Sequence, residues 1–193
     1  MTSETELVHP PAISSWRRNG IGVLRIVFGA IWAVDAWFKW QPSFINNFAD
    51  YLNGAQKDQP LLIHHWIGFW INSVGLDPIV FAYVVAASET LIAVALIFGV
   101  FTNLTAVYGA VLSLLIWSTA EGFGGPYASG SADIGAAVIY VLVFAGLFLA
   151  SSGLYLGLDR RMAPHMGRFG FLASGTIPVD QRAQRRQPRL AVS

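Results

Sequence analysis

Long runs of apolar residues alternate with shorter polar stretches along most of the chain. A membrane-spanning helix needs about 20 mostly apolar residues, and four runs come near that length. These runs cover approximately residues 20–40, 78–100, 104–120 and 134–150. The pattern therefore predicts an all-α integral membrane protein whose four spans form a four-helix bundle.

A further apolar run lies at residues 61–74 and is too short to cross a bilayer. It follows the polar segment 41–60, so the two together form a long connection between the first and second spans. We expect an interfacial or re-entrant helix in this run. The connection is predicted to lie on the outer face of the membrane.

The first apolar run carries three ionisable residues, Arg25, Asp35 and Lys39. Together with Trp32 they follow the spacing i, i+7, i+10 and i+14, which places all four on one stripe of a helix. A charge at membrane depth costs at least about 2.5 kcal/mol. We therefore expect this stripe to face the other helices or a wet cavity.

The composition supports a membrane protein and excludes several kinds of chemistry. Hydrophobic residues make up 54% of the chain and charged residues 12%, whereas soluble domains contain about 25% charged residues. Cysteine is absent, which excludes disulfides, thiolate metal sites and iron–sulfur ligation within this chain. We expect a multi-pass protein of the cell (cytoplasmic) membrane whose partner is the lipid bilayer and not nucleic acid.

Basic residues determine the expected orientation. Of the twelve Lys and Arg residues, two precede the first span and seven follow the fourth, and such residues remain on the cytoplasmic side. We therefore predict that both termini are cytoplasmic. The predicted parts are a flexible tail at 1–19, a membrane domain at 20–152 and a basic tail at 153–193.

The charges inside the spans suggest ion pairs. With a rise of about 1.5 Å per residue, Arg25 of the first span and Glu89 of the second lie at similar depths, and a pair between them would neutralise both. Asp35 and Lys39 form an i, i+4 pair near the outer surface. The alternatives are that Arg25 and Lys39 extend their charged ends to the interface, and that Glu89 is a structural glutamate.

The loop EGFGGPYASGSAD, residues 121–133, is the most specific local feature. Gly124 and Gly125 permit close approach of the backbone to a ligand, and Tyr127 follows them. Glu121 and Asp133 flank the loop, near water. Thirteen residues exceed what a connection between antiparallel helices needs, so we predict a functional loop; the alternative is an ordinary connector.

His64 and His65 are neighbours in the outer connection. On a helix they would point about 100° apart and could not easily hold one metal together, so no metal site is predicted. One of them could bond a quinone oxygen or a haem iron; a solvated histidine is the alternative. Trp32, Trp66 and Trp117 are candidates for a flat aromatic pocket.

Several of these features resemble the DoxX/DoxD superfamily. They are the four spans, the acid and base of the first helix, the mid-span Ser-Glu-Thr around Glu89, and the sequence WSTAEGFGGPYASGSADIGAAVIYVLVF. Within that superfamily the chain is similar to the DoxD-like large subunit of thiosulfate:quinone oxidoreductase. The resemblance covers about residues 20–152 and implies quinone-linked oxidation of a small reduced sulfur compound, together with a small DoxA-type subunit that this chain does not contain.

These observations give a first assignment of roles. Glu89, Asp35 and Glu121 are the candidate catalytic residues, because carboxylates can move the protons that accompany quinone reduction. The cofactor, expected to be a quinone with haem left open, would contact Arg25, Trp32, His64 and His65. The candidate substrate residues are Lys39, Gly124, Gly125, Tyr127 and Asp133.

Three functions are compatible with this pattern. The first is a subunit of a quinone-linked oxidoreductase that works with an additional redox subunit or as a homo-oligomer. The second is a non-catalytic membrane anchor or assembly partner of a redox or envelope complex. The third is a small-solute transporter, which ranks lowest because no pair of interrupted helices is visible.

Overall fold

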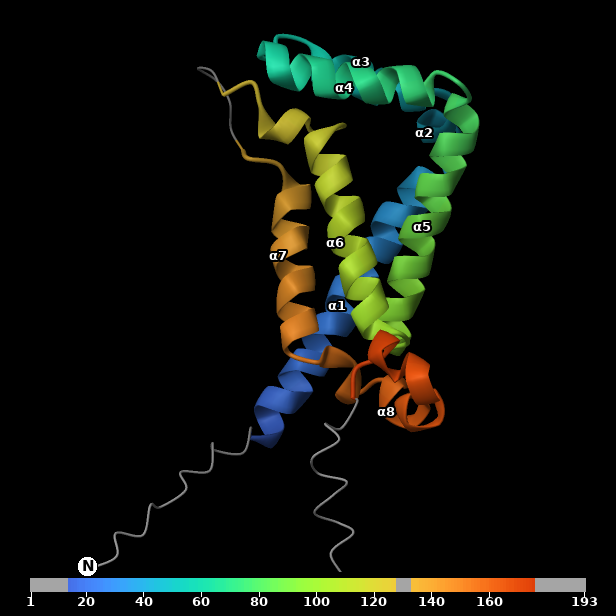
Figure 1. Ribbon diagram of the computed structural model, residues 1–193, viewed down its shortest axis with the longest axis vertical. Helices are drawn as coiled ribbons and strands as arrows, with labels where there is room; N and C mark the ends of the chain where they lie inside the picture. Colours follow the sequence, from blue (N-terminus) through green and yellow to red (C-terminus); the bar gives the residue numbers. More distant parts are fainter. Residues whose placement is uncertain (1–13, 128–132, 176–193) are drawn as a thin grey trace, which may run out of the picture.

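The computed structural model describes residues 14–127 and 133–175, and every regular element within them is helical (Figure 1). The α-helices are α1 (Ser15–Lys39), α2 (Pro42–Asn46), α3 (Phe48–Gln56), α4 (Leu61–Val74), α5 (Pro78–Phe98), α6 (Thr102–Ser118), α7 (Ala136–Leu149) and α8 (Asp159–Met162). Short 3-10 turns are η1 (Gly122–Gly124), η2 (Ser152–Leu154), η3 (Ala163–His165) and η4 (Gly167–Leu172). The predicted all-α class is confirmed.

Four helices, α1, α5, α6 and α7, run lengthwise through the molecule (Figure 1). The most extensive contacts join α1 to α5 and α6 to α7. Their bounds differ from the predicted spans by a few residues at the ends. The largest difference is at the start of α1, which begins at Ser15 and not near residue 20, because the polar residues before Gly20 continue the helix.

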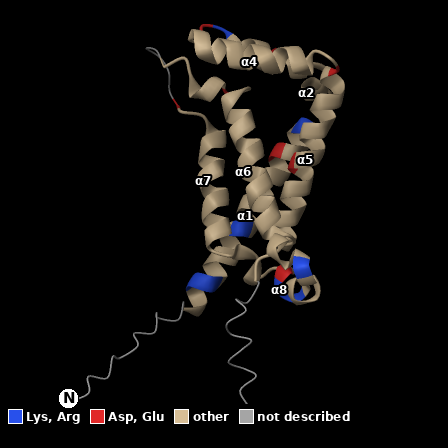
Figure 2. Ribbon diagram, in the orientation of Figure 1, with Lys and Arg blue, Asp and Glu red and all other residues tan. Residues whose placement is uncertain are grey.

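The outward faces of the four lengthwise helices are apolar. Helices α1 and α5, with 25 and 21 residues, are long and apolar enough to cross a membrane, whereas α6 and α7 have only 17 and 14 residues. Large exposed side chains on these faces include Val27, Leu91, Val111 and Leu142. Figure 2 shows that charged residues gather mainly towards the two ends of the molecule. The apolar middle is the surface that lipid would cover.

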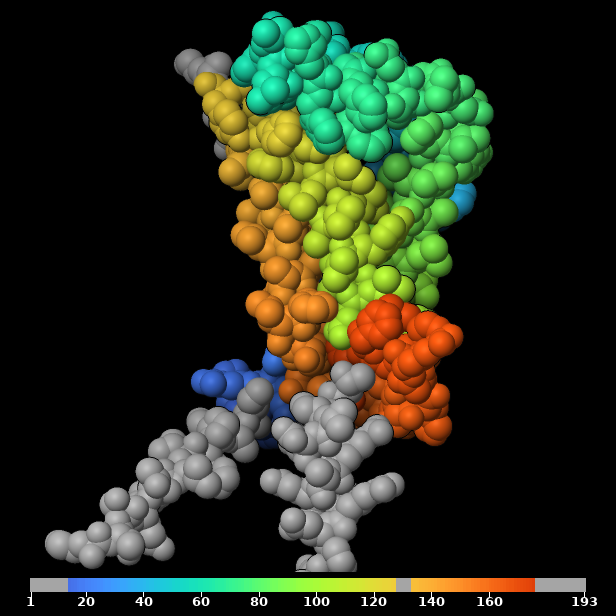
Figure 3. Space-filling model, viewed as in Figure 1, coloured from blue at the N-terminus to red at the C-terminus, as the bar shows by residue number. Residues whose placement is uncertain are grey.

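Helices α2, α3 and α4 form a layer across one end of the lengthwise helices (Figures 1 and 3). Within this layer α3 packs on α4, and both α2 and α3 contact α5. The layer has its own small buried cluster of Leu52, Ile67 and Val74. The apolar run at 61–74 therefore forms a helix that lies over the end of the molecule and does not run beside the other spans.

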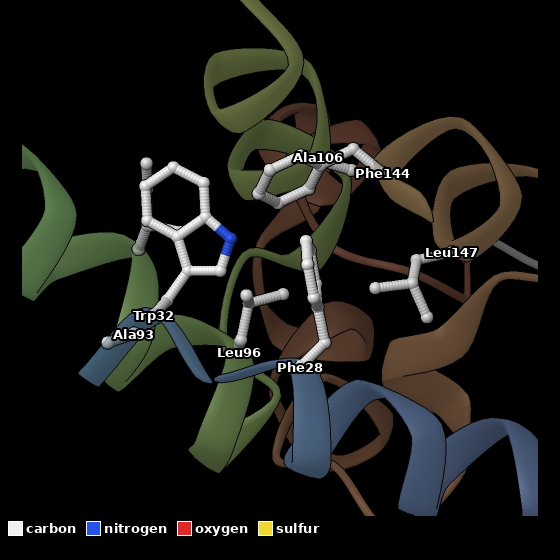
Figure 4. Close-up of a cluster of buried hydrophobic side chains, with 8 residues drawn as sticks. Phe28, Trp32, Ala93, Leu96, Ala106, Phe144 and Leu147 are labelled. Atoms are coloured by element: carbon white, nitrogen blue, oxygen red, sulfur yellow. The ribbon is translucent and has the colours of Figure 1, made fainter. Parts of the chain in front are cut away.

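The main core joins α1 to α5, α6 and α7 (Figure 4). Phe28 and Trp32 of α1 contact Phe144 of α7, with ring centroids 4.9 and 5.5 Å apart. Gly109 of α6 lies where a Cβ atom would overlap the ring of Phe144. The glycine therefore lets α6 and α7 approach closely, as small residues do between membrane helices.

Arg25 is fully buried near the end of the molecule opposite the α2–α4 layer. Its Nε donates a hydrogen bond to the Leu96 carbonyl at 2.8 Å. Its Nη1 donates to the carbonyls of Ser152 and Tyr155 at 2.6 and 3.0 Å, and its Nη2 donates to the Leu156 carbonyl at 2.9 Å. One guanidinium thus joins α1, α5 and the chain that follows α7.

The predicted ion pair between Arg25 and Glu89 is wrong. Arg25 bonds the last turn of α5 at Leu96, whereas Glu89 lies about two turns earlier in that helix. The carbonyls at a helix C-terminus carry partial negative charge. Because one such carbonyl, that of Leu96, and three carbonyls of the segment after α7 already satisfy the guanidinium, Arg25 has no need of a carboxylate in direct contact.

Asp159 of α8 is the second fully buried charge at this end. Its carboxylate accepts hydrogen bonds from the backbone N–H groups of Phe101, Thr102 and Ser174 at 2.7, 2.9 and 2.9 Å, and from the Thr102 hydroxyl at 2.6 Å. It therefore caps the N-terminus of α6. The described part of the predicted tail, 153–175, is folded against the helices because these bonds hold it; residues 1–13 and 176–193 lie outside the described residues.

Replacing Arg25 with Gln should destabilise the protein strongly. The amide cannot reach all four carbonyls, and removal of a buried charged partner typically costs about 3 to 5 kcal/mol. Thermal unfolding in detergent would measure the loss. Arg18→Gln, an exposed change on the same helix, should have almost no effect. Equal melting temperatures for the two variants would contradict the role assigned to Arg25.

Candidate functional site

A cavity of about 700 Å³ lies beneath the α2–α4 layer, between α1, α5 and α6. We call it the capped cavity, because the layer covers it at that end. Most of its wall is apolar or aromatic, including Phe44, Phe48, Trp70, Phe81, Val85, Leu112 and Leu115. Its size and lining are those of a site for an apolar small molecule.

An ion pair forms the main charged feature of the wall of the capped cavity. The Nζ atom of Lys39 lies 3.6 Å from Oε2 of Glu89, and the two side chains are 24% and 2% exposed. Charge-assisted N–H···O bonds are usually about 2.7 to 2.9 Å long, so this pair is loose. Both groups therefore keep hydrogen-bonding capacity that a ligand in the cavity could use.

The structure corrects the predicted pairing of Lys39 with Asp35. Within the described residues, the ion-pair partner of Lys39 is Glu89 on the neighbouring helix. Asp35 is half-buried, does not line the capped cavity and interacts instead with Tyr140 of α7.

A second polar feature on the wall of the cavity, a pair of hydroxyl groups, was not predicted from the sequence. Ser88 and Tyr108 share a hydrogen bond of 2.7 Å between their hydroxyl groups. Ser88 precedes Glu89, so its position beside a mid-span acid was a usable signal. Nothing in the sequence around Tyr108 indicates that it lies opposite Ser88, because the two come from different helices.

Glu121 has a structural role in addition to its place on the cavity wall. Its carboxylate accepts hydrogen bonds from the backbone N–H of Ala137 at 3.1 and 3.3 Å. Ala137 lies in the first turn of α7, where N–H groups have no partner within the helix. The loop acid thus joins the end of α6 to the start of α7.

The described part of the glycine-rich loop packs against the α2–α4 layer and does not line the cavity beyond Glu121. Gln59 donates a hydrogen bond to the Gly122 carbonyl at 3.3 Å. Tyr127 is exposed and donates to the Phe123 carbonyl, and Asp133 is exposed and accepts from the N–H of Ile134. Residues 128–132 of the predicted loop lie outside the described residues.

Lys39 is separate in the structure from the other predicted substrate residues, which belong to the loop. Lys39 lies on the wall of the capped cavity, whereas Gly124, Gly125, Tyr127 and Asp133 do not. A single substrate site that contains all five is therefore not formed by the described chain.

The predicted cofactor residues are also dispersed. His64 and His65 are exposed on α4 and do not line the cavity. Within the described residues, no group of three or more His, Asp or Glu side chains could hold a metal ion. Arg25 lies in the carbonyl cluster described above, so neither it nor the histidines belong to the capped cavity.

The three tryptophans proposed for one aromatic pocket lie in different places. Trp32 is buried in the core against Phe144. Trp66 stands on α4, and Trp117 packs against Phe123 of the loop. The aromatic pocket instead comes from residues that surround the capped cavity.

The two loop glycines should respond differently to alanine. Gly124 has a φ of +77°, and a Cβ there would overlap the backbone of Ile134, so Gly124→Ala should lower the melting temperature clearly. Gly125 has a φ of −89°, and its Cβ would lie 3.2 Å from the Gln59 side chain. Gly125→Ala should therefore be nearly neutral. Thermal unfolding would check both, and equal effects would contradict the assigned loop geometry.

Comparison with known sequences identifies the family. The sequence model of the DoxX family matches residues 20–122, from the first turns of α1 to the start of η1. No curated protein and no solved structure matches the chain significantly. The match covers more than half of the chain and includes Lys39, Glu89 and Glu121, the charged residues on the wall of the capped cavity. Together with the apolar outward helices, it shows that this chain is a membrane protein that belongs to the DoxX family.

Proposed function

We propose that the capped cavity binds the head group of a membrane quinone, and that the protein is the membrane subunit of a quinone-linked oxidoreductase. The observation that carries this proposal is a large, mostly apolar cavity with the Lys39–Glu89 pair on its wall. A quinone ring is flat and apolar, and its two carbonyl oxygens accept hydrogen bonds. The apolar and aromatic walls suit such a ring, and the Lys39–Glu89 pair offers polar groups to its oxygens.

The ion pair supplies the polar chemistry of the proposed site. Reduction of a quinone to a quinol takes up two electrons and two protons. The Lys39 ammonium would donate a hydrogen bond to a quinone carbonyl and stabilise the negative charge that develops on its oxygen. Glu89, which is almost fully buried beside it, would first take up a proton from water and then pass it to that oxygen. The second proton would reach the other quinone oxygen from water.

The side chains around the cavity support entry from the bilayer. Phe38 of α1, Val84 of α5 and Tyr108 of α6 line the cavity and are 59%, 56% and 45% exposed. These three helices also carry the apolar outward faces. A ligand dissolved in lipid would therefore meet apolar side chains along its path into the cavity.

The electrons in this proposal come from outside the chain. Cysteine is absent, and the described residues hold no cluster of metal ligands. A small reduced compound or a partner subunit would therefore deliver them to the bound quinone directly. The DoxD resemblance favours a sulfur compound as the donor.

We further propose that all four lengthwise helices cross the membrane and that both termini are cytoplasmic. The described basic residues at 17–18 and 160–168 lie at the end of the molecule that is opposite the α2–α4 layer (Figure 2). Cytoplasmic segments carry an excess of Lys and Arg. The α2–α4 layer and the capped cavity would then lie on the outer side of the membrane.

Labelling of single cysteines should verify this orientation, since the parent chain has none. Gly54→Cys introduces a side chain into open space on α3, and Ser14→Cys lies exposed before α1. A membrane-impermeant maleimide added to intact cells should label Gly54→Cys only, and should label Ser14→Cys after the membrane is opened. The reverse pattern would overturn the orientation.

Quinone binding should depend on the ion pair. Titration of the purified protein with a short-chain ubiquinone or menaquinone should quench its tryptophan fluorescence, because Trp70 lines the cavity. Lys39→Met and Glu89→Gln should each weaken binding at least about tenfold, the equivalent of about 1.4 kcal/mol. His65→Gln, an exposed change on α4, is the matched control and should bind normally.

The opposite result separates this proposal from the main alternative. If neither analogue binds and no quinone is extracted from the protein purified in mild detergent, the capped cavity is not a quinone site. Co-purification of other subunits in that case would favour a non-catalytic anchor or assembly partner.

A further inference from the structure

A second hollow lies at the end of the molecule opposite the capped cavity. It has a volume of about 700 Å³ and lies between the end of α5 and the segment that leads into α8. We call it the α5–α8 groove. Its walls include Ile97, Phe98, Leu156, Leu158, Arg160 and Arg161.

The two arginines of the groove carry positive charge that the described chain leaves unneutralised. Both are exposed, and neither forms an ion pair with another described residue. The neighbouring acid, Asp159, is fully buried, and its carboxylate is bonded to the start of α6 and to Ser174. The fold thus separates one acid from two adjacent bases.

The remainder of the groove is apolar and continuous with a membrane-facing helix. Phe98, Leu156 and Leu158 are 55%, 59% and 42% exposed although they are large apolar side chains. Phe98 ends α5, whose outward face also exposes Val94 one turn earlier. Apolar surface from the span therefore leads directly to the two arginines.

Neighbouring turns have the composition of a membrane interface. Arg168 lies over the ring of Phe169, 4.9 Å from its centroid, and Phe171 is 62% exposed. Aromatic and basic side chains concentrate at the level of lipid head groups. This places the groove where a phosphate and the first part of an acyl chain would meet the protein.

We propose that the α5–α8 groove binds an anionic phospholipid. Arg160 and Arg161 would hold the phosphate with charge-assisted hydrogen bonds, and an acyl chain would lie along Phe98 and the outward face of α5. Basic pockets beside membrane helices recognise anionic head groups in this way. The apolar walls favour a lipid over free inorganic phosphate, which has no apolar part to bury. This site is independent of the capped cavity.

The test compares lipid retention in two variants that lose the same charge. The full-length protein and its variants are reconstituted in vesicles of equal parts phosphatidylglycerol and phosphatidylcholine, extracted in mild detergent, and examined by native mass spectrometry. The parent should retain phosphatidylglycerol in preference to phosphatidylcholine. Arg160→Gln/Arg161→Gln should reduce that retention at least about tenfold, whereas Arg17→Gln/Arg18→Gln, at the exposed start of α1, should not.

Each other outcome overturns the proposal. Equal loss of phosphatidylglycerol retention in the two double variants would show that the lipid is attracted by positive charge in general and has no specific site in the groove. Unchanged retention in Arg160→Gln/Arg161→Gln, with its melting temperature also unchanged, would show that the groove is not the binding site. Stabilisation of the detergent-solubilised parent by inorganic phosphate, without enrichment of phosphatidylglycerol, would show that the arginines hold a free anion and not a lipid.

Discussion

The buried guanidinium of Arg25 is the interaction on which the arrangement of the helices depends. A cation without water or hydrogen bonds would be prohibitively costly at this position. The structure satisfies it with four carbonyl oxygens from the end of α5 and the residues after α7. Because these carbonyls come from distant parts of the chain, Arg25 is stable only when α1, α5 and the segment after α7 are assembled together.

Asp159 makes the complementary interaction with the N-terminus of the next helix, α6. Its carboxylate bonds the first N–H groups of α6, which begins just after α5 ends. A cation therefore meets the C-terminus of one helix and an anion meets the N-terminus of the next, and both agree with the helix dipoles. The turn between α5 and α6 is thus held rigidly by two buried charges that belong to other segments.

The other end of the molecule is built differently, and this difference produces the candidate site. There the lengthwise helices leave the capped cavity between them, and the α2–α4 layer covers it. Its charged groups, Lys39 and Glu89, come from two helices and form a loose pair next to the cavity. Arg25 and Asp159 are both hydrogen-bonded within the protein, whereas Lys39 and Glu89 keep hydrogen-bonding capacity for a ligand. The residues that match the DoxX family, 20–122, include Lys39, Glu89 and the whole α2–α4 layer.

Sequence patterns were enough to predict the helical class, the approximate extents of the lengthwise helices and the helix at residues 61–74, because apolar length and periodicity are local properties. They also identified Lys39 and Glu89 as candidates, since charges in apolar runs are conspicuous. The partners of the charged residues depend on how the helices pack: Arg25 bonds carbonyls and not Glu89, and Lys39 pairs with Glu89 and not with Asp35. Spacing along one helix cannot show which residues of another helix lie opposite, nor which backbone oxygens a distant turn presents. Contacts of that kind exist only after the helices have packed.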